Sequence, residues 1–189
     1  MKKYTVDETF KGIDFSDQTN QPKDYENCNF TDCNFAGVNL NDFSFEDCTF
    51  ENCDLSNARV NNTAFKNIHF KSCKLIGVQF DTCNTFLLAF KFTLCIMNYT
   101  SFYNLKIPET NFKECSIIEA DFTETDLSKA VFEACDLSGT VFSKTKLLKA
   151  DFRSSVNFTI DPEQNGMSGA KFSLESLPGL LQKYDIIVG

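Results

Sequence analysis

Nine cysteines are the residues of this 189-residue chain whose type and spacing could do chemistry. The stretch NCNFTDCNF, residues 27–35, places two of them five positions apart, and DCTFENCDL, residues 47–55, repeats the arrangement 20 residues later. Cysteines spaced so evenly fit three interpretations, which are metal ligation, a disulfide framework and the packing of a hydrophobic core. The choice decides whether the chain carries reactive groups at all.

Two of these interpretations are weak. The N-terminus MKKYTVDETF has no apolar run after its lysines, so we expect no secretory signal and a reducing, cytoplasmic location in which disulfides are rare. No stretch approaches the roughly 18 apolar residues of a membrane span. A zinc site would usually include histidine, and the chain has a single one, His69. We therefore expect no metal, no cofactor and no disulfide framework.

A large apolar residue recurs every five positions along most of the chain, and a smaller residue often lies two positions before it. Such spacing fits neither a helix of period 3.6 nor a simple strand of period 2. Within each unit, however, the small and large side chains share one side of an extended segment, and the other three residues favour turns and solvent. One series is Phe10, Phe15, Tyr25, Phe30, Phe35, Leu40, Phe45, Phe50, Leu55, Val60, Phe65, Phe70, Leu75 and Phe80. The second is Leu87, Phe92, Met97, Phe102, Ile107, Phe112, Ile117, Phe122, Leu127, Phe132, Leu137, Phe142, Leu147 and Phe152.

The cysteines indicate how many units make one turn of such a coil. Cys33, Cys53 and Cys73 are 20 residues apart, as are Cys95, Cys115 and Cys135, whereas Cys73 and Cys95 are 22 apart. Four five-residue units per turn would place these six thiols in one column, with two extra residues inserted near residues 81–86. All nine cysteines then occupy the small inward position, where a free cysteine behaves as a small hydrophobe. The cysteines are therefore predicted to fill a core.

The units CDLSN, ADFTE, TDLSK, CDLSG and ADFRS resemble the repeating unit of pentapeptide repeat proteins, over about residues 8–156. This resemblance implies an all-β fold, a right-handed quadrilateral β-helix. We expect residues 1–156 to form about seven coils, with a register offset near 81–86, and residues 157–189 to form a C-terminal cap and dimerisation segment. The repeat says little about function, because one architecture serves many roles.

The C-terminal tail, residues 157–189, indicates which functions to consider. Ser173 or Ser176 can cap a short helix that has Pro178 in its first turn, and solenoid ends need a cover. The tail resembles the dimerisation segment of the Qnr, MfpA and microcin B17 immunity subgroup, whose members are dimeric rods that mimic DNA and bind DNA gyrase or topoisomerase IV. The residues expected at a homodimer interface are Leu177, Leu180, Leu181, Ile186, Ile187 and Val188.

The net charge of -8 and pI of about 4.7 argue against direct nucleic-acid binding and suit a basic protein surface. The outward acids expected to contact a partner are Asp42, Glu46, Asp47, Glu51, Asp54, Glu119, Asp121, Glu124 and Asp126. Two chains supply -16, whereas duplex DNA as long as the dimer, roughly 70 Å, carries about 40 negative charges. Mimicry would therefore need a focused acidic face, and the alternative is that these acids only keep the surface solvated.

Near the register offset, one group of apolar residues falls on outward positions and is predicted to form an exposed patch. Such a patch can mark a partner surface, unless the distorted segment itself covers it. Its residues are Phe86, Leu88, Leu94, Ile96, Tyr99 and Tyr103. Residues 16–24, SDQTNQPKD, are expected to form a degenerate unit or small loop. Relatives that protect gyrase from quinolones carry projecting loops, and this chain has room only for that modest one.

Catalysis is not expected, because the carboxylates point to solvent and a packed core leaves no pocket of the usual size. The favoured hypothesis is a cytoplasmic, dimeric, DNA-mimicking protein that binds a type II topoisomerase, modulates it or gives resistance to a topoisomerase poison, and does not contact a membrane. The alternative is a protein-interaction scaffold that uses the apolar patch. A third possibility is a fold of this kind with no topoisomerase contact.

Overall fold

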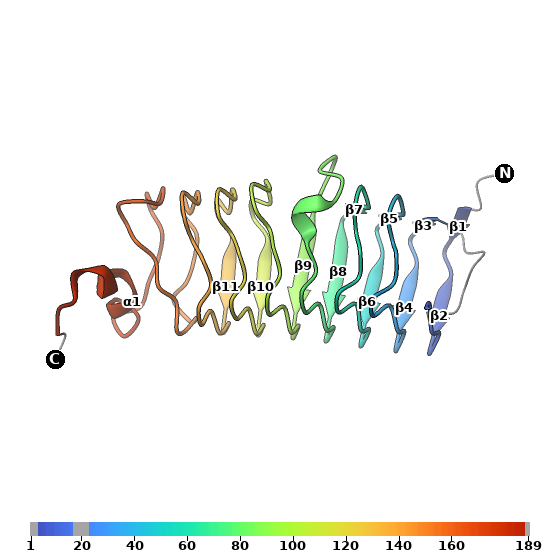
Figure 1. The fold of residues 1–189 in the computed structure, drawn as a ribbon, viewed down its shortest axis with the longest axis horizontal. Coiled ribbons are helices and arrows are strands. Elements are labelled where there is room, and N and C mark those ends of the chain that lie inside the picture. Colours follow the sequence, from blue (N-terminus) through green and yellow to red (C-terminus); the bar gives the residue numbers. More distant parts are fainter. Residues whose placement is uncertain (1–3, 17–22, 188–189) are drawn as a thin grey trace.

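The computed structural model describes residues 4–16 and 23–187 and shows one elongated rod of stacked coils (Figure 1). The predicted loop at residues 16–24 therefore lies largely outside the described residues. Short strands recur along the rod, and almost all have three residues. They are β1 (Tyr4–Val6), β2 (Thr9–Lys11), β3 (Asp24–Glu26), β4 (Asn29–Thr31), β5 (Ser44–Glu46), β6 (Thr49–Glu51), β7 (Ala64–Lys66), β8 (Ile68–Lys71), β9 (Phe90–Thr93), β10 (Asn111–Lys113) and β11 (Val131–Glu133).

The coils stack through parallel pairing and give the rod four long faces. The first face carries the sheet β1-β3-β5-β7 and the second carries the sheet β11-β10-β9-β8-β6-β4-β2. Isolated parallel bridges build the third face from Asp14 to Val156 and the fourth from Asn39 to Val141. Partners are 20 residues apart, as in Phe30 with Phe50, except across the insertion, where Phe70 pairs with Phe92. The predicted four-sided β-helix is confirmed.

A column of stacked phenylalanines fills the core because each central residue of the second face lies above its counterpart one coil away. The rings of Phe112 and Phe132 are 4.7 Å apart at 4°, and those of Phe132 and Phe152 are 4.7 Å apart at 10°. Between faces the rings meet edge to face, as for Phe122 and Phe132 at 85°. Both arrangements are favourable for aromatic rings and add to the stabilisation from burial.

In many units the small inward position holds a cysteine, threonine or serine that donates a hydrogen bond to a backbone carbonyl 23 residues earlier, and in others it holds alanine or valine. Cys73 Sγ donates to Phe50 O at 3.2 Å, Thr63 Oγ1 to Leu40 O at 2.7 Å and Ser155 Oγ to Phe132 O at 2.7 Å. All nine cysteines are buried and free, so their predicted role in the core is confirmed. Cysteine suits this position because it combines a small apolar body with a weak donor.

The corners between faces require left-handed backbone at nearly every unit. In the first coils this position holds residues that tolerate positive φ, such as Asp32 (φ 55°), Gly37 (φ 67°) and Asn52 (φ 54°). Further along it holds Glu119 (φ 53°) and Lys129 (φ 60°), which have no such preference. The C-terminal coils therefore depend more on core packing and inter-coil hydrogen bonds to hold their corners.

The two inserted residues form a loop that projects from the first face, visible on the green coil beside β9 in Figure 1. Asn84 still pairs with Ala64, and the chain returns to the ladder where Ala89 N donates to Phe65 O at 3.2 Å. The inward assignment of Leu87 is wrong, because Leu87 is 63% exposed with φ 56°. Phe90 fills the core instead, 5.7 Å from the Phe65 ring.

The C-terminal end continues the coil before it becomes irregular. Parallel bridges join Lys146 to Gly166 and Asp151 to Lys171, and Phe152 stacks on Phe172. The chain then forms α1 (Pro178–Leu181) and the 3-10 helix η2 (Gln182–Tyr184). The described ranges contain one further helix, the 3-10 helix η1 (Phe80–Thr82) at the start of the insertion. Over those ranges, no helix has the length and apolar character to cross a membrane.

Candidate partner-binding surfaces

Three of the predicted acidic residues gather on the N-terminal part of the first face. Glu46 lies on β5, and Asp42 and Asp47 lie at the two corners that flank this strand. The neighbouring strand β3 adds Asp24 and Glu26, and Glu26 pairs in register with Glu46. We call these five residues the acidic face. Asp24 and Glu26 are not among the acids predicted to contact a partner, although the 20-residue period places them beside Glu46.

The other predicted acids are spread over all four faces, although Glu119 and Glu124 flank Asp121 on the fourth face as Asp42 and Asp47 flank Glu46 on the first. Glu51 lies on the second face, Asp54 on the third, Asp121 on the fourth and Asp126 on the C-terminal part of the first. Glu119 and Glu124 occupy successive corners of the rod. Acids spaced by five residues are turned by about a quarter of the coil, so a charged run in the sequence becomes a ring around the rod.

Lysines from the next coil neutralise many of these carboxylates. Ion pairs 20 residues apart join Glu51 to Lys71 at 2.6 Å and Glu124 to Lys144 at 3.6 Å. Burial would raise the pKa of Asp126, but hydrogen bonds from Ser128 and the nearby Lys146 outweigh it and hold that pKa below its usual value. On the acidic face, Glu46 pairs with Lys66 at 2.8 Å, whereas the residue in register with Glu26 on the next coil is Glu46, another acid. This register of acid beside acid concentrates negative charge on the acidic face.

The predicted apolar patch is exposed but encircles the rod. Leu94 lies at the corner after the second face, Ile96 on the third face, Tyr99 at the next corner and Tyr103 on the fourth face. Phe86, 68% exposed, lies on the projecting loop. Leu88 differs from expectation, because it is half-buried and packs against the core while Leu87 is exposed in its place. A single flat partner surface could not contact all of these residues.

The tail residues predicted to form a dimer interface differ in exposure. Leu180 packs against the core, Leu181 is half-buried, and Leu177, Ile186 and Ile187 are exposed. Val188 lies outside the described residues. Leu174, 81% exposed, and Tyr184, 50% exposed, add apolar surface that was not among the predicted interface residues. The tail therefore combines a segment that covers the last coil with a second, uncovered apolar surface.

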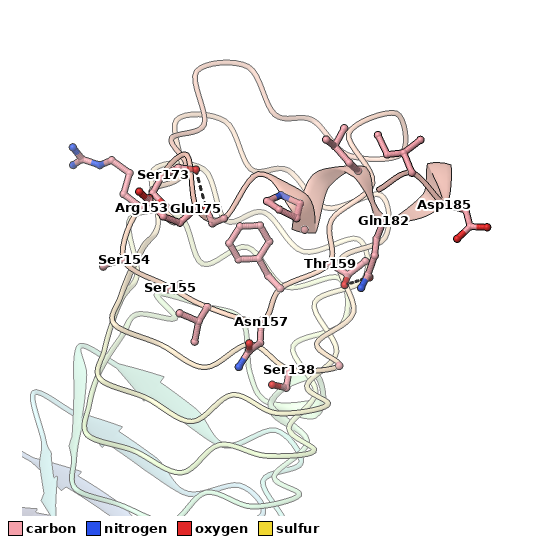
Figure 2. A pocket seen from close by; sticks show the side chains of 18 residues that line it. Ser138, Arg153, Ser154, Ser155, Asn157, Thr159, Ser173, Glu175, Gln182 and Asp185 are labelled. Atoms are coloured by element: carbon pink, nitrogen blue, oxygen red, sulfur yellow. Dashed lines mark hydrogen bonds between the residues drawn. The ribbon is translucent and has the colours of Figure 1, made fainter. Parts of the chain in front are cut away.

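An open cleft of about 1050 Å³ separates this tail from the last coils (Figure 2). Hydroxyl and amide side chains of Ser138, Ser154 and Asn157 line the coil side, and Gln182 and Asp185 approach from the tail. Thr159 Oγ1 and Gln182 Oε1 share a hydrogen bond across it. Over the described ranges, no three side chains of His, Cys, Asp or Glu are grouped to hold a metal ion, here or elsewhere.

Comparisons with known proteins agree with this architecture. Two trypsin-treated forms of QnrB1, a plasmid-mediated fluoroquinolone resistance protein, are similar to the chain with TM-scores of 0.65 at 18% identity, over 99% and 98% of this chain and 100% and 99% of theirs. Full-length QnrB1 is similar with a TM-score of 0.55 at 17% identity, over 96% of this chain and 99% of its own. No curated protein sequence matches the chain.

At such identities the structural likeness establishes the fold. The sequence model of the pentapeptide repeat region matches residues 23–102 and 43–122, which together span more than half of the chain. These matched residues include the acidic face, the projecting loop and most of the phenylalanine column. The five-residue period, the four-sided coil and this match all describe the same protein class, and the chain therefore belongs to the pentapeptide repeat family.

Proposed function

We propose that this protein is a non-enzymatic, DNA-mimicking binding protein that engages a type II topoisomerase through its acidic face. Such binding would modulate the topoisomerase or give resistance to a topoisomerase poison. The likeness to QnrB1, a fluoroquinolone resistance protein, supports this proposal at the level of overall shape. The observation that carries it is the gathering of Asp24, Glu26, Asp42, Glu46 and Asp47 on one stretch of one face.

The local charge density of the acidic face supports this role better than the net charge does. Two neighbouring coils of parallel strands span about 10 Å, and duplex DNA of that length carries about six phosphates. The acidic face presents five carboxylates on such a stretch, which also carries the base Lys23, and Glu46 is paired with Lys66 of the next coil. The focused face thus approaches the density of DNA locally, although the whole chain, at -8, does not.

The proposal includes a homodimer formed end to end through the tail. Leu177, Ile186 and Ile187 are exposed beside α1, and apolar side chains left uncovered on a rod end favour association. A dimer of this kind would place the two acidic faces toward opposite ends of a longer rod. Truncation after residue 173 would then give a monomer in sedimentation experiments.

A DNA gyrase supercoiling assay at low and moderate salt tests the proposal. The wild-type protein is expected to inhibit supercoiling at micromolar concentration, and added salt should weaken inhibition because it screens exposed charges. The triple variant Asp42→Asn, Glu46→Gln and Asp47→Asn should inhibit less. A matched control that removes the same charge elsewhere, Glu109→Gln, Glu114→Gln and Glu133→Gln, should inhibit like wild type. Equal loss in both variants, or no inhibition at all, would contradict the proposal.

A second candidate is a protein-interaction scaffold that uses the projecting loop. The specific observation is the exposure of Phe86 (68%) and Leu87 (63%) at adjacent positions. Apolar contacts depend little on salt, so binding that survives added salt and is lost on Phe86→Ser would favour this candidate. Binding that salt abolishes and Phe86→Ser leaves intact would favour the acidic face.

A further inference from the structure

The first face of the rod has opposite charge at its two ends. Its N-terminal part, with the flanking corners, presents six acids and two bases, namely Asp7, Asp24, Glu26, Asp42, Glu46 and Asp47 against Lys23 and Lys66. Its C-terminal part presents five bases and three acids, namely Lys106, Lys129, Lys144, Lys146 and Lys149 against Glu109, Glu124 and Asp126. The face is therefore acidic toward the N-terminus and basic toward the C-terminus.

The projecting loop stands at the midpoint of this face. Four strands, β1, β3, β5 and β7, precede it, and four bridged positions, Lys106, Asp126, Lys146 and Gly166, follow it. The loop carries the exposed pair Phe86 and Leu87, and Leu87 adopts left-handed backbone at φ 56°. Left-handed backbone recurs at the corners of the rod, at Leu94 and Tyr99 among others, but Leu87 carries it on the projecting loop where the charge of the face changes sign.

We propose that this face is an interface for a second copy of the chain, which docks side by side and antiparallel about a two-fold axis beside the loop. Such an axis brings the acidic part of each copy opposite the basic part of the other. The two loops then meet at the centre, where Phe86 and Leu87 of both copies bury their apolar surface. An isologous contact of this kind uses the same patch twice and closes at the dimer.

The axis pairs coils that are equally far from the loop. The coil of Glu26 lies three steps before the loop, and the coil of Lys149 lies three steps after it. Within the described residues neither side chain forms an ion pair in the monomer, so both charges are available. Inside one chain the two are about 29 Å apart, at six coil spacings of about 4.8 Å. A contact between Glu26 and Lys149 can therefore form only between copies.

The charge pattern and the loop that point to this interface do not depend on the proposed topoisomerase binding or on the end-to-end tail dimer. It would, however, cover the acidic face, so a side-by-side dimer could not present that face to another partner.

Carbodiimide cross-linking of mixed unlabelled and ¹⁵N-labelled full-length protein tests the geometry. Mass spectrometry should find Glu26–Lys149 links with mixed isotopes, because zero-length links need direct contact. An end-to-end tail dimer cannot produce them, since its two Glu26 residues lie at opposite ends. Association without this link, or no association by analytical ultracentrifugation at low salt, would overturn the proposal.

Variants then test the two forces separately. The pair Phe86→Ser and Leu87→Asn should raise the dimer dissociation constant about tenfold or more, since central apolar residues dominate interfaces. Asparagine tolerates the left-handed corner, so the fold is preserved. The matched control Val141→Ser, at an exposed residue of the fourth face, should leave the dimer dissociation constant unchanged. The single variant Glu26→Lys should weaken association, and the double variant Glu26→Lys with Lys149→Glu should restore it. If the double variant associates no better than the single one, the charge pairing is refuted.

Discussion

Lys66 Nζ lies 2.8 Å from Glu46 Oε2, although 20 residues separate them in the chain. The same separation joins Glu51 to Lys71 and Glu109 to Lys129. Each coil thus supplies the counter-charge for the coil before it, so the charge of a face depends on the register of the stack and not on the local sequence. On the acidic face, the coil that follows Glu26 supplies another acid in register, Glu46, instead of a lysine.

Lys66→Gln should strengthen binding to a basic partner, because it frees Glu46 to act as an uncompensated charge. Exposed ion pairs contribute only about 0.2–1 kcal/mol, so the free energy of unfolding should change by less than about 1 kcal/mol. Gyrase inhibition at low salt measures the gain and urea denaturation measures the stability. Lys71→Gln, on the second face, serves as the control and should not improve inhibition.

The buried thiols should make the protein less stable at alkaline pH. Burial raises the pKa of Cys48 and of Cys83 to about 12, from an ordinary value of 9.0. Between about pH 9 and pH 12 the unfolded chain loses these protons while the folded chain keeps them. The unfolded state then binds fewer protons, so the free energy of unfolding falls as pH rises, by up to about 1.4 kcal/mol per pH unit for each thiol.

Urea denaturation at several pH values from neutral to alkaline checks this effect. Stability should be constant below about pH 8 and fall above about pH 9. The double variant Cys48→Ala and Cys83→Ala should be less stable at neutral pH, because it loses packing in the core, but its stability should fall less steeply with pH. An identical slope for variant and wild type would show that these two thiols do not ionise on unfolding.

Most of the architecture could be predicted from residue spacing, since a coil of four five-residue units leaves few positions ambiguous. The cysteine column and the phenylalanine column both follow from it. The insertion could not be predicted in the same way, because Leu87 and Leu88 fit the inward position equally well by residue type. The structure resolves the choice through Phe90, whose ring fills the core below the loop. The candidate surfaces were predicted only in part, because acids five residues apart point in different directions.

Leu87→Asn should stabilise the monomer by about 1 kcal/mol. Leu87 has φ 56°, a conformation that costs leucine roughly 1–2 kcal/mol and that asparagine adopts more readily, and its exposed side chain loses little burial. Thermal unfolding of dilute protein measures the effect. Leu88→Asn is the contrasting variant, because Leu88 packs against the core and its loss should destabilise the fold. If Leu88→Asn were the stabilising variant, Leu88 and not Leu87 would be the exposed leucine of the loop, which would contradict this assignment.

Gly179→Ala should detach the tail from the last coil. A methyl group at this position would clash with the Phe158 carbonyl oxygen and lie 3.0 Å from two atoms of the Phe158 ring, while Gly179 O accepts a hydrogen bond from Ile160 N at 3.0 Å. The Phe158 carbonyl is part of the backbone and cannot move aside as a flexible side chain can, so the contact between the tail and Phe158 should break. Limited proteolysis should then cut within residues 173–187 many times faster than in wild type. Gly166→Ala, whose methyl group would meet nothing closer than 3.5 Å, should resist cleavage as wild type does. The strands pair with one another and not with the tail, so they are expected to stay folded; a variant whose strands also unfold would show instead that the tail stabilises the whole rod.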